Sequence, residues 1–206
     1  NLCLIYMAKF KVAVLISGNG SNLQAIIDEF QNNNNVDVCC VLSNKKEAYG
    51  LERASKADID NYFIDHNQFL SREEFENNLI DTLDKYKPNL VVLAGFMRIL
   101  SDVFVNKYAG KLINIHPSLL PKYKGLETHR KVLENNDQYH GVTVHFVDNT
   151  LDGGPICAQS SLRVETKDIK KLEDEIHKLE HSIYPEVINK IALGKIYLSD
   201  GEVIKK

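Results

Sequence analysis

The sequence of 206 residues is poor in cysteine, carries no excess of positive charge and contains no long hydrophobic run. Its 25 Lys and Arg against 28 Asp and Glu give a net charge of −3, which argues against a nucleic-acid partner, because general nucleic-acid binders are usually basic. No apolar run approaches the roughly 20 residues that span a bilayer, so no membrane partner is expected. The four cysteines show no C-x-x-C pair and no regular spacing, which argues against a disulfide framework or a cysteine zinc site and favours a cytoplasmic location.

The first eight residues, NLCLIYMA, are apolar but lack the basic start and the small-residue cleavage site of a signal peptide. We interpret Met7 as the natural start and expect residues 1–8 to be an extension outside the fold. No internal repeat and no low-complexity linker interrupts the rest of the chain, so residues 9–206 are predicted to form one domain.

Apolar strands alternate with amphipathic helices over the first 116 residues. The strands are expected at 11–16, 36–42, 62–64, 90–94 and just before 116, and the helices at 23–30, 47–57, 71–86 and 102–108. This alternation predicts an α/β fold with a single-domain, doubly wound and mostly parallel sheet. After residue 125 we expect a helix at 128–135, strands at 142–147 and 156–164, a long helix from 169 and a hairpin at 195–204.

The stretch NIHPSLLP, residues 114–121, follows an apolar strand and leaves it through two prolines. Because side chains alternate along a strand, Asn114 and His116 lie on the same face. Ligands of open α/β sheets bind at the carboxyl ends of the strands. Two polar side chains at such an end therefore indicate a functional site rather than a core.

The glycine-rich turn GNGSN, residues 18–22, joins the first strand to the first helix. A dinucleotide fingerprint would need a third glycine at position 23, where the chain has Leu23. The turn still offers free N–H groups and a positive helix end to an anion, which suits a single phosphate monoester. The alternative is a plain tight turn in which Ser21 or Asn22 caps the helix.

Asp152 precedes Gly153 and Gly154, which would let a loop carry its carboxylate close to other groups. A carboxylate beside a histidine fixes the ring and favours the imidazolium form. No G-x-S-x-G motif or activated nucleophile accompanies these residues, so a covalent acyl-enzyme is unsupported. Direct group transfer remains, with an amide and an imidazolium stabilising an oxyanion.

Four segments together resemble the phosphoribosylglycinamide (GAR) formyltransferase family: NIHPSLLPKYKG, AGFMRIL, SGNGSN and LDGGPI. The resemblance extends from about residue 9 to about residue 193. It implies that the amine of GAR attacks the formyl group of 10-formyltetrahydrofolate, a co-substrate, in purine biosynthesis, without a metal. Both substrates are small molecules, and we expect a monomer or a weak homodimer.

The resemblance also implies roles for individual residues. Asn114 and His116 would stabilise the oxyanion, and Asp152 would hold His116 protonated and help to move the proton of the amine. The residues implied to bind GAR are Gly20, Ser21, Asn22, His177, Lys178, Leu179 and Glu180, with Glu180 the foremost of the late group. Those implied to bind the folate are Arg72, Met97, Arg98, Ile99, Leu100, Asn114, Asp148, Asn149, Thr150, Leu151 and Asp152.

Four other functions share some of these sequence features. Residues 177–181 spell H-x-x-E-H, a zinc-protease pattern, but no third ligand stands out and no metal is expected. A formyltetrahydrofolate deformylase would use the same Asn, His and Asp, and a methionyl-tRNA formyltransferase would need a nucleic-acid domain and more positive charge. A phosphosugar-binding module would leave the catalytic trio unexplained. The remaining histidines, His66, His129, His140 and His145, are interpreted as surface or packing residues.

Overall fold

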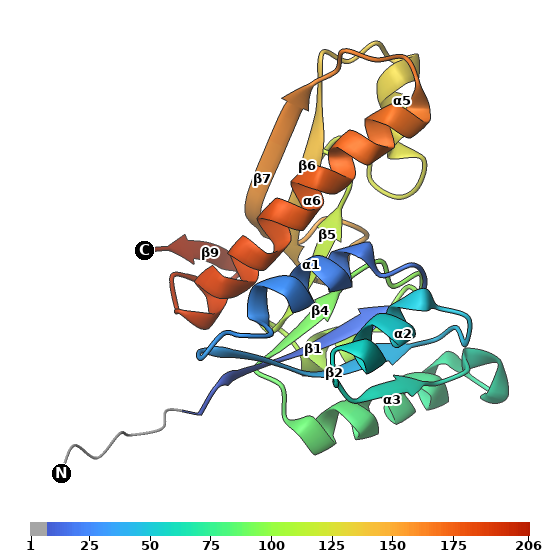
Figure 1. Ribbon diagram of the computed structural model, residues 1–206, viewed down its shortest axis with the longest axis vertical. Helices are drawn as coiled ribbons and strands as arrows, with labels where there is room; N and C mark the ends of the chain where they lie inside the picture. The colour runs from blue at the N-terminus through green and yellow to red at the C-terminus, as the bar shows by residue number, and fades with distance from the viewer. Residues whose placement is uncertain (1–7) are drawn as a thin grey trace.

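The computed structural model describes residues 8–206 (Figure 1), so the expectation of an N-terminal extension falls outside the described residues, apart from Ala8. Seven strands form one sheet in the order β3-β2-β1-β4-β5-β6-β7. The strands are β1 Phe10–Ile16, β2 Val36–Ser43, β3 Asn61–Phe63, β4 Leu90–Leu93, β5 Leu112–His116, β6 Tyr139–Phe146 and β7 Ile156–Arg163. The strands β3, β2, β1, β4 and β5 pair in parallel. Strand β6 is antiparallel to β5, and β7 is antiparallel to β6.

Helices cover both faces of this sheet, as the alternating pattern predicted. They are α1 Ser21–Phe30, α2 Tyr49–Lys56, α3 Arg72–Tyr86, α4 Asp102–Lys107, α5 Thr128–Glu134 and α6 Ile169–Ala192, with a 3-10 turn, η1, at His66–Gln68. The prediction of a doubly wound, mostly parallel sheet is confirmed. The reversed direction of β6, which makes both of its pairings antiparallel, was not part of that prediction.

The parallel strands divide the core into two layers because their side chains alternate between the two faces. Val12 and Val14 of β1 pack with the helices α1 and α6, whereas Ala13 and Leu15 pack with α3 and α4. On α1, the buried residues follow the predicted i, i+3, i+4, i+7 spacing: Leu23, Ile26, Ile27 and Phe30. All four residues of β4 are buried, as expected for a strand in the middle of the sheet.

Helix α6 is the longest element, and it lies against α1, β6 and β7 (Figure 1). Its Tyr184 is fully buried and donates its hydroxyl to the carbonyl oxygens of Leu93, at 2.8 Å, and Ile113, at 3.3 Å. The helix is therefore fixed to the carboxyl end of β4 and to the first residues of β5. None of the helices between residues 8 and 206 is long and apolar enough to cross a membrane.

Two further features lie at the ends of elements. Ser71 caps α3 by accepting from the Glu74 amide, and the Glu74 carboxylate accepts from the amide of Leu70 rather than from that of Ser71. The expected C-terminal hairpin forms a separate two-stranded sheet of β8 Ile196–Ser199 and β9 Glu202–Lys205 around Asp200 and Gly201.

Candidate active site

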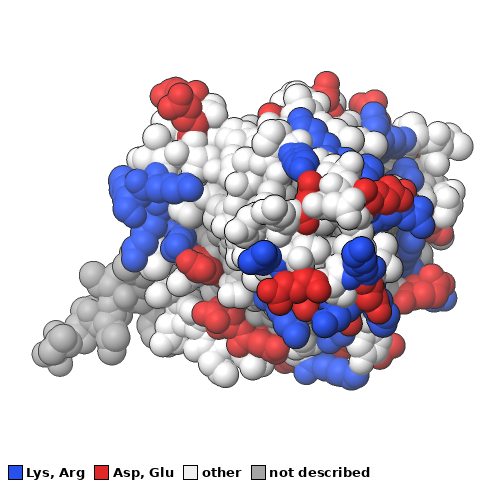
Figure 2. Space-filling view, turned by 90° about the horizontal axis from the view of Figure 1, so that it is seen from above, with Lys and Arg blue, Asp and Glu red and all other residues white. Residues whose placement is uncertain are grey.

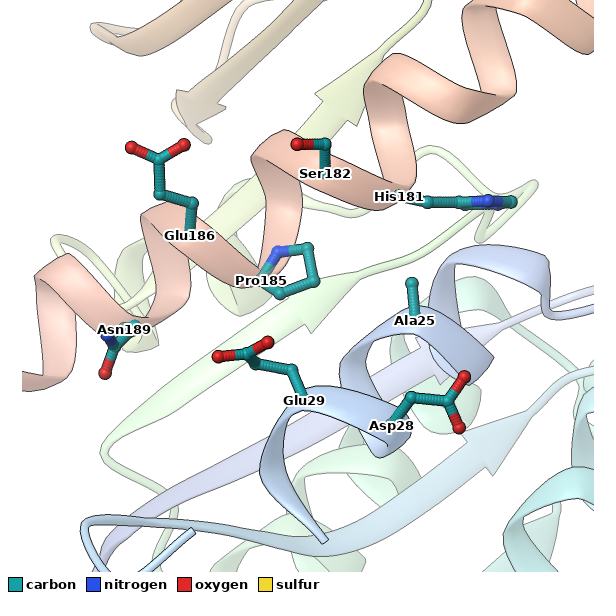
Figure 3. Close-up of a pocket in the computed structure, with 8 residues that line it drawn as sticks. All are labelled: Ala25, Asp28, Glu29, His181, Ser182, Pro185, Glu186 and Asn189. Carbon is teal, nitrogen blue, oxygen red and sulfur yellow. The ribbon is translucent and has the colours of Figure 1, made fainter. Parts of the chain in front are cut away.

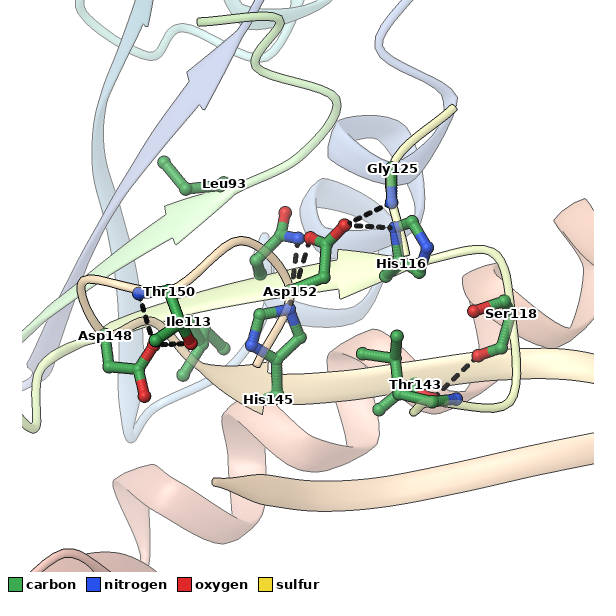
Figure 4. Close-up of polar contacts among 12 residues, drawn as sticks. Leu93, Ile113, His116, Ser118, Gly125, Thr143, His145, Asp148, Thr150 and Asp152 are labelled. Atoms are coloured by element: carbon green, nitrogen blue, oxygen red, sulfur yellow. Dashed lines mark hydrogen bonds and ion pairs between the residues drawn. The ribbon is translucent and has the colours of Figure 1, made fainter. Parts of the chain in front are cut away.

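Asn114 and His116 lie at the carboxyl end of β5. The loop between β6 and β7 folds back and places Asp152 beside His116 (Figure 4). The Asp152 Oδ2 atom is 3.5 Å from His116 Nδ1 and accepts a hydrogen bond of 2.8 Å from the amide of Gly125. Both side chains are almost completely shielded from water. The structure thus joins His116 to Asp152, which lies 36 positions later in the chain.

The two ring nitrogens of His116 both face oxygen acceptors. Nε2 lies 2.8 Å from the carbonyl oxygen of Tyr123, which can only accept, and Nδ1 faces the Asp152 carboxylate. Only an imidazolium has an N–H group for each of these partners. Asp137 fixes the segment that carries the Tyr123 carbonyl, because it accepts from the Tyr123 hydroxyl at 2.7 Å and from the Lys122 ammonium at 2.6 Å. The segment after β5 thus holds the carbonyl oxygen that faces His116.

His145 is the functional residue that the sequence interpretation missed. It is buried on β6 directly opposite Asn114, and its Nε2 is 3.3 Å from the Asn114 amide nitrogen. Its Nδ1 lies 2.8 Å from the carbonyl oxygen of Phe146, so Nδ1 carries the proton and Nε2 is free to accept. Burial lowers the pKa of His145 against smaller opposing effects, which keeps the ring neutral. His145 consequently orients the Asn114 amide.

A signal for this residue does exist in the sequence. Thr143 and His145 alternate with the apolar residues of a strand otherwise buried on every side, and a polar pair of this kind also marked Asn114 and His116. What the pattern could not show is that β6 pairs with β5 in the register that sets His145 against Asn114. The interpretation of His145 as a packing residue was incomplete.

The loop that carries Asp152 is shaped by small residues and by a local turn. Asp148 accepts from the amide of Thr150 at 2.8 Å and from its hydroxyl at 2.5 Å. A Cβ on Gly154 would overlap the carbonyl oxygen of Phe146, so only glycine fits there. Asp152 itself has a φ of 46°, in the left-handed region. The Oδ1 atom of Asp152 lies 3.9 Å from His145 Nε2, so the carboxylate stands between two imidazoles.

The glycine turn has the form of an anion site. Gly20 is the N-cap of α1 with a φ of 75°, and no side chain caps the helix. The alternative in which Ser21 or Asn22 acts as the N-cap is therefore wrong. The side-chain amide nitrogen of Asn22, Nδ2, donates at 3.0 Å to Glu180 Oε2, and this bond joins the turn to α6. Burial raises the pKa of Glu180, although the bond from Asn22 acts in the opposite direction.

The other late-helix residues are placed less closely. His177 lies one turn before His181 with its ring stacked at 6.2 Å, and its charge opposes the rise in the pKa of Glu180 that burial causes. Lys178 is exposed and Leu179 packs against the core. The structure thus joins Gly20, Ser21 and Asn22 to Glu180 and leaves His177 beside them, whereas no hydrogen bond ties Lys178 to the turn within residues 8–206.

The segment predicted to bind the folate follows β4 and exposes apolar side chains. Met97 is 64% and Ile99 72% exposed, and Leu151, on the loop of Asp152, is 60% exposed. The Met97 amide donates at 2.8 Å to the hydroxyl of Ser17, which in turn donates to Asn44 at 2.5 Å. Exposed apolar groups held on an ordered backbone suit a flat aromatic ligand. Arg98 is exposed and Leu100 half-buried, while Arg72 is exposed at the start of α3 and Asn149 and Thr150 lie on the Asp152 loop.

A hollow of about 510 Å³ lies elsewhere, between α1 and α6 (Figure 3). Ala25, Asp28 and Glu29 border it from α1, and five residues from α6: His181, Ser182, Pro185, Glu186 and Asn189. Three carboxylates on its walls disfavour an anionic substrate. None of the catalytic trio lines it, so we do not assign the reaction to this hollow.

Lysines and arginines lie among acidic side chains on the face shown in Figure 2, which gives no single-sign patch there. Among residues 8–206, no group of three or more His, Cys, Asp and Glu side chains is placed to hold a metal ion.

Known proteins match the chain along most of its length. The formyl transferase family matches residues 10–188. A phosphoribosylglycinamide formyltransferase from Escherichia coli (strain K12) is 51% identical over 92% of this chain and 91% of its own length. The structure of a phosphoribosylglycinamide formyltransferase from Coxiella burnetii superposes with a TM-score of 0.92 at 47% identity, covering 96% of this chain and 94% of its own. A glycinamide ribonucleotide transformylase from Symbiobacterium toebii gives a TM-score of 0.93 at 38% identity, covering 100% of this chain and 97% of its own. The chain belongs to the formyl transferase family and, within it, to the phosphoribosylglycinamide formyltransferases.

Proposed function

We propose that the chain transfers the formyl group of 10-formyltetrahydrofolate to the amine of GAR, in purine biosynthesis, directly and without a covalent enzyme intermediate. The observation that carries the mechanism is the joining of Asn114, His116 and Asp152 at the end of β5, with no activated nucleophile among them. The amine nitrogen attacks the formyl carbon, and the carbonyl electron pair becomes an oxyanion. The bond from the formyl carbon to N10 then breaks. One proton leaves the amine and one arrives at N10.

Asn114 and His116 stabilise the oxyanion. The Asn114 amide uses one N–H group on His145, which leaves its second N–H group for the oxyanion. His116 contributes positive charge beside it, in a place almost closed to water where charge acts more strongly than in bulk solvent. Neither group needs to reorganise during the reaction, because strand β5 and the partners of each side chain already fix it.

Asp152 has two roles in this proposal. Its carboxylate balances the charge of His116 and keeps the ring in its present orientation. It also accepts the proton of the attacking amine, directly or through one water molecule. The amide of Gly125 holds Oδ2, so the atom nearer to His145, Oδ1, is the better proton acceptor.

GAR lies between the glycine turn and α6. Its phosphate is held by the free N–H groups of Gly20, Ser21 and Asn22, and its ribose by Glu180, with His177 near the ribose and the amine. The folate lies along residues 97–100 and 148–152, where exposed apolar side chains can cover its ring. This placement brings the two substrates together at Asn114.

The alternative enzyme, a formyltetrahydrofolate deformylase, is not favoured by the named relatives. An absorbance assay of 10-formyltetrahydrofolate with and without GAR separates the two activities. We expect folate turnover only when GAR is present. Turnover at the same rate with water alone would support the hydrolase and overturn the transferase proposal.

Two further properties belong to this proposal. We infer a monomer or weak homodimer in the cytoplasm. The three cysteines of the described chain, Cys39, Cys40 and Cys157, are free thiols, which agrees with a reducing compartment. Size-exclusion chromatography with light scattering at micromolar concentration tests the oligomeric state, and a stable higher oligomer would contradict it.

A further inference from the structure

The glycine turn is supported from outside by the first turn of α2. The amide of Gly50 donates at 3.2 Å to the carbonyl oxygen of Gly18. A Cβ on Gly20 would lie 2.7 Å from the Cα atom of Gly50, so the two backbones are in direct contact. Helix α2 therefore helps to define the shape of the turn, although no residue of α2 was predicted to belong to the site.

Arg53, one turn further along α2, joins the glycine turn to helix α1. Its Nε donates to the carbonyl oxygen of Asn19 at 2.9 Å and its Nη2 to the Asn19 side-chain oxygen at 3.0 Å. Its Nη1 donates to the side-chain oxygen of Gln24 on α1, also at 3.0 Å. The guanidinium lies over the ring of Tyr49 at 4.8 Å. A planar fork with several fixed donors can span the turn in this way, whereas an ammonium cannot.

Arg53 carries its charge without a close acidic partner in the described part of the chain. No carboxylate lies within 4.0 Å of its guanidinium between residues 8 and 206. The charge of Arg53 also acts on helix α6. Burial is the main cause that lowers the pKa of His181, and the charges of His177 and Arg53 lower it further. A fixed, uncompensated cation thus stands beside the positive end of α1.

We propose that Arg53 is a positioning residue for the acceptor phosphate: it holds the glycine turn in its binding shape and supplies the positive charge that selects a dianionic phosphate monoester over an uncharged hydroxyl. This inference rests on the proposed placement of GAR. It concerns recognition rather than chemistry, so kcat should depend on Arg53 much less than KM does.

The test compares Arg53→Gln with the wild type on GAR and on the same molecule without its phosphate. We expect the KM for GAR to rise roughly tenfold or more, the scale of one charge interaction near a protein surface, with kcat within about threefold. The kcat/KM for the dephosphorylated substrate should be the same in both proteins. Arg53→Lys keeps the charge but loses the fork, so its KM for GAR should fall between the other two. Arg163→Gln, at an exposed position on β7, is the control for loss of one positive charge.

Two results would overturn the inference. One is an unchanged KM for GAR in Arg53→Gln, and the other is an equal loss on both substrates, which would mean that Arg53 only stabilises the fold. NMR titration of His181 provides a readout independent of activity: its pKa should rise in Arg53→Gln and stay constant in Arg163→Gln. An unchanged pKa in Arg53→Gln would also contradict the inference.

NMR of GAR binding separates an error in the proposed placement of GAR from an error in the proposed role of Arg53. If GAR leaves the amide signals of residues 18–22 unmoved in the wild-type protein, the phosphate does not bind at the turn and the placement of GAR is wrong. If GAR shifts these signals equally in the wild type and in Arg53→Gln, with equal affinity, the placement stands and the role of Arg53 falls.

Discussion

Asn114 and His145 face each other as partners across β5 and β6, with the amide nitrogen of Asn114 3.3 Å from His145 Nε2. The tautomer of His145 is fixed by the Phe146 carbonyl, so the direction of the Asn114 amide is fixed in turn. The amide oxygen and nitrogen of an asparagine are easily exchanged by rotation. In this site the neutral imidazole favours only one of the two orientations.

Replacement of His145 should therefore lower kcat through Asn114. His145→Phe fills the space but cannot accept a hydrogen bond, so the amide can rotate. We expect a fall in kcat of about 10²-fold, as for a small misplacement of a catalytic group, with little change in KM. His145→Gln retains an acceptor and should keep more activity. In the Asn114→Ala background, His145→Phe should have almost no further effect, and independent, multiplying losses would contradict the coupling.

Asp152→Asn should preserve the fold but remove the anion between the two imidazoles. We expect kcat to fall by at least about 10²-fold, the scale of lost general acid–base help, with GAR binding nearly unchanged. Single-turnover kinetics and calorimetric titration with GAR separate the two quantities. Wild-type kcat in this variant would remove Asp152 from the catalytic residues.

Gly20→Val should damage the phosphate site specifically. The new side chain would be strained at a φ of 75° and would press on Gly50 at 2.7 Å, which distorts the N–H groups of the turn. We expect a large rise in the KM for GAR. Gly18→Ala is the matched control, because its Cβ would meet nothing within 4 Å and its φ is not in the left-handed region. If both variants behave alike, the turn has no special role in binding.

The stability of the fold should fall in mild acid because of His140. Burial, helped by the charge of His129, lowers the pKa of His140 from 6.5 to about 4, and Nε2 of His140 lies 2.9 Å from His129 Nδ1. Since the folded-state pKa is lower, the unfolded chain binds the proton first. The contribution is complete above pH 6.5 and is lost as the pH falls towards 4, by at most about 3 kcal/mol.

Urea unfolding at several pH values between 4.5 and 7.5 tests this dependence. The wild type should lose stability as the pH falls over that range. His140→Gln should be less stable at pH 7.5, because it loses a buried contact, but its stability should change less with pH. An equal slope in both proteins would assign the acid sensitivity to other groups.

The parallel part of the fold could be predicted from the sequence, because a local pattern of apolar residues or glycines indicates each of its elements. The apolar spacing of α1, the wholly buried β4 and the glycine turn depend on neighbours along the chain. The roles of His145 and Arg53 depend instead on contacts between distant segments, Asn114 with His145 and Asn19 with Arg53. Periodicity carries no information on strand register or on which helix touches a turn. These two residues could not be assigned without the structure.

Helix α6 also sets the distance between the glycine turn and strands β4 and β5. Glu180 and Tyr184 are one turn apart on its inner face: the first meets the glycine turn and the second is bonded to β4 and β5. The depth at which the acceptor sits, relative to Asn114, is thus set by a helix and two strands rather than by loops. Tyr184→Phe removes the hydroxyl that bonds α6 to β4 and β5 without altering a side chain proposed to contact a substrate, so this variant tests the spacing. The distance between the two bound substrates would then be determined by the packing of α6 against the sheet.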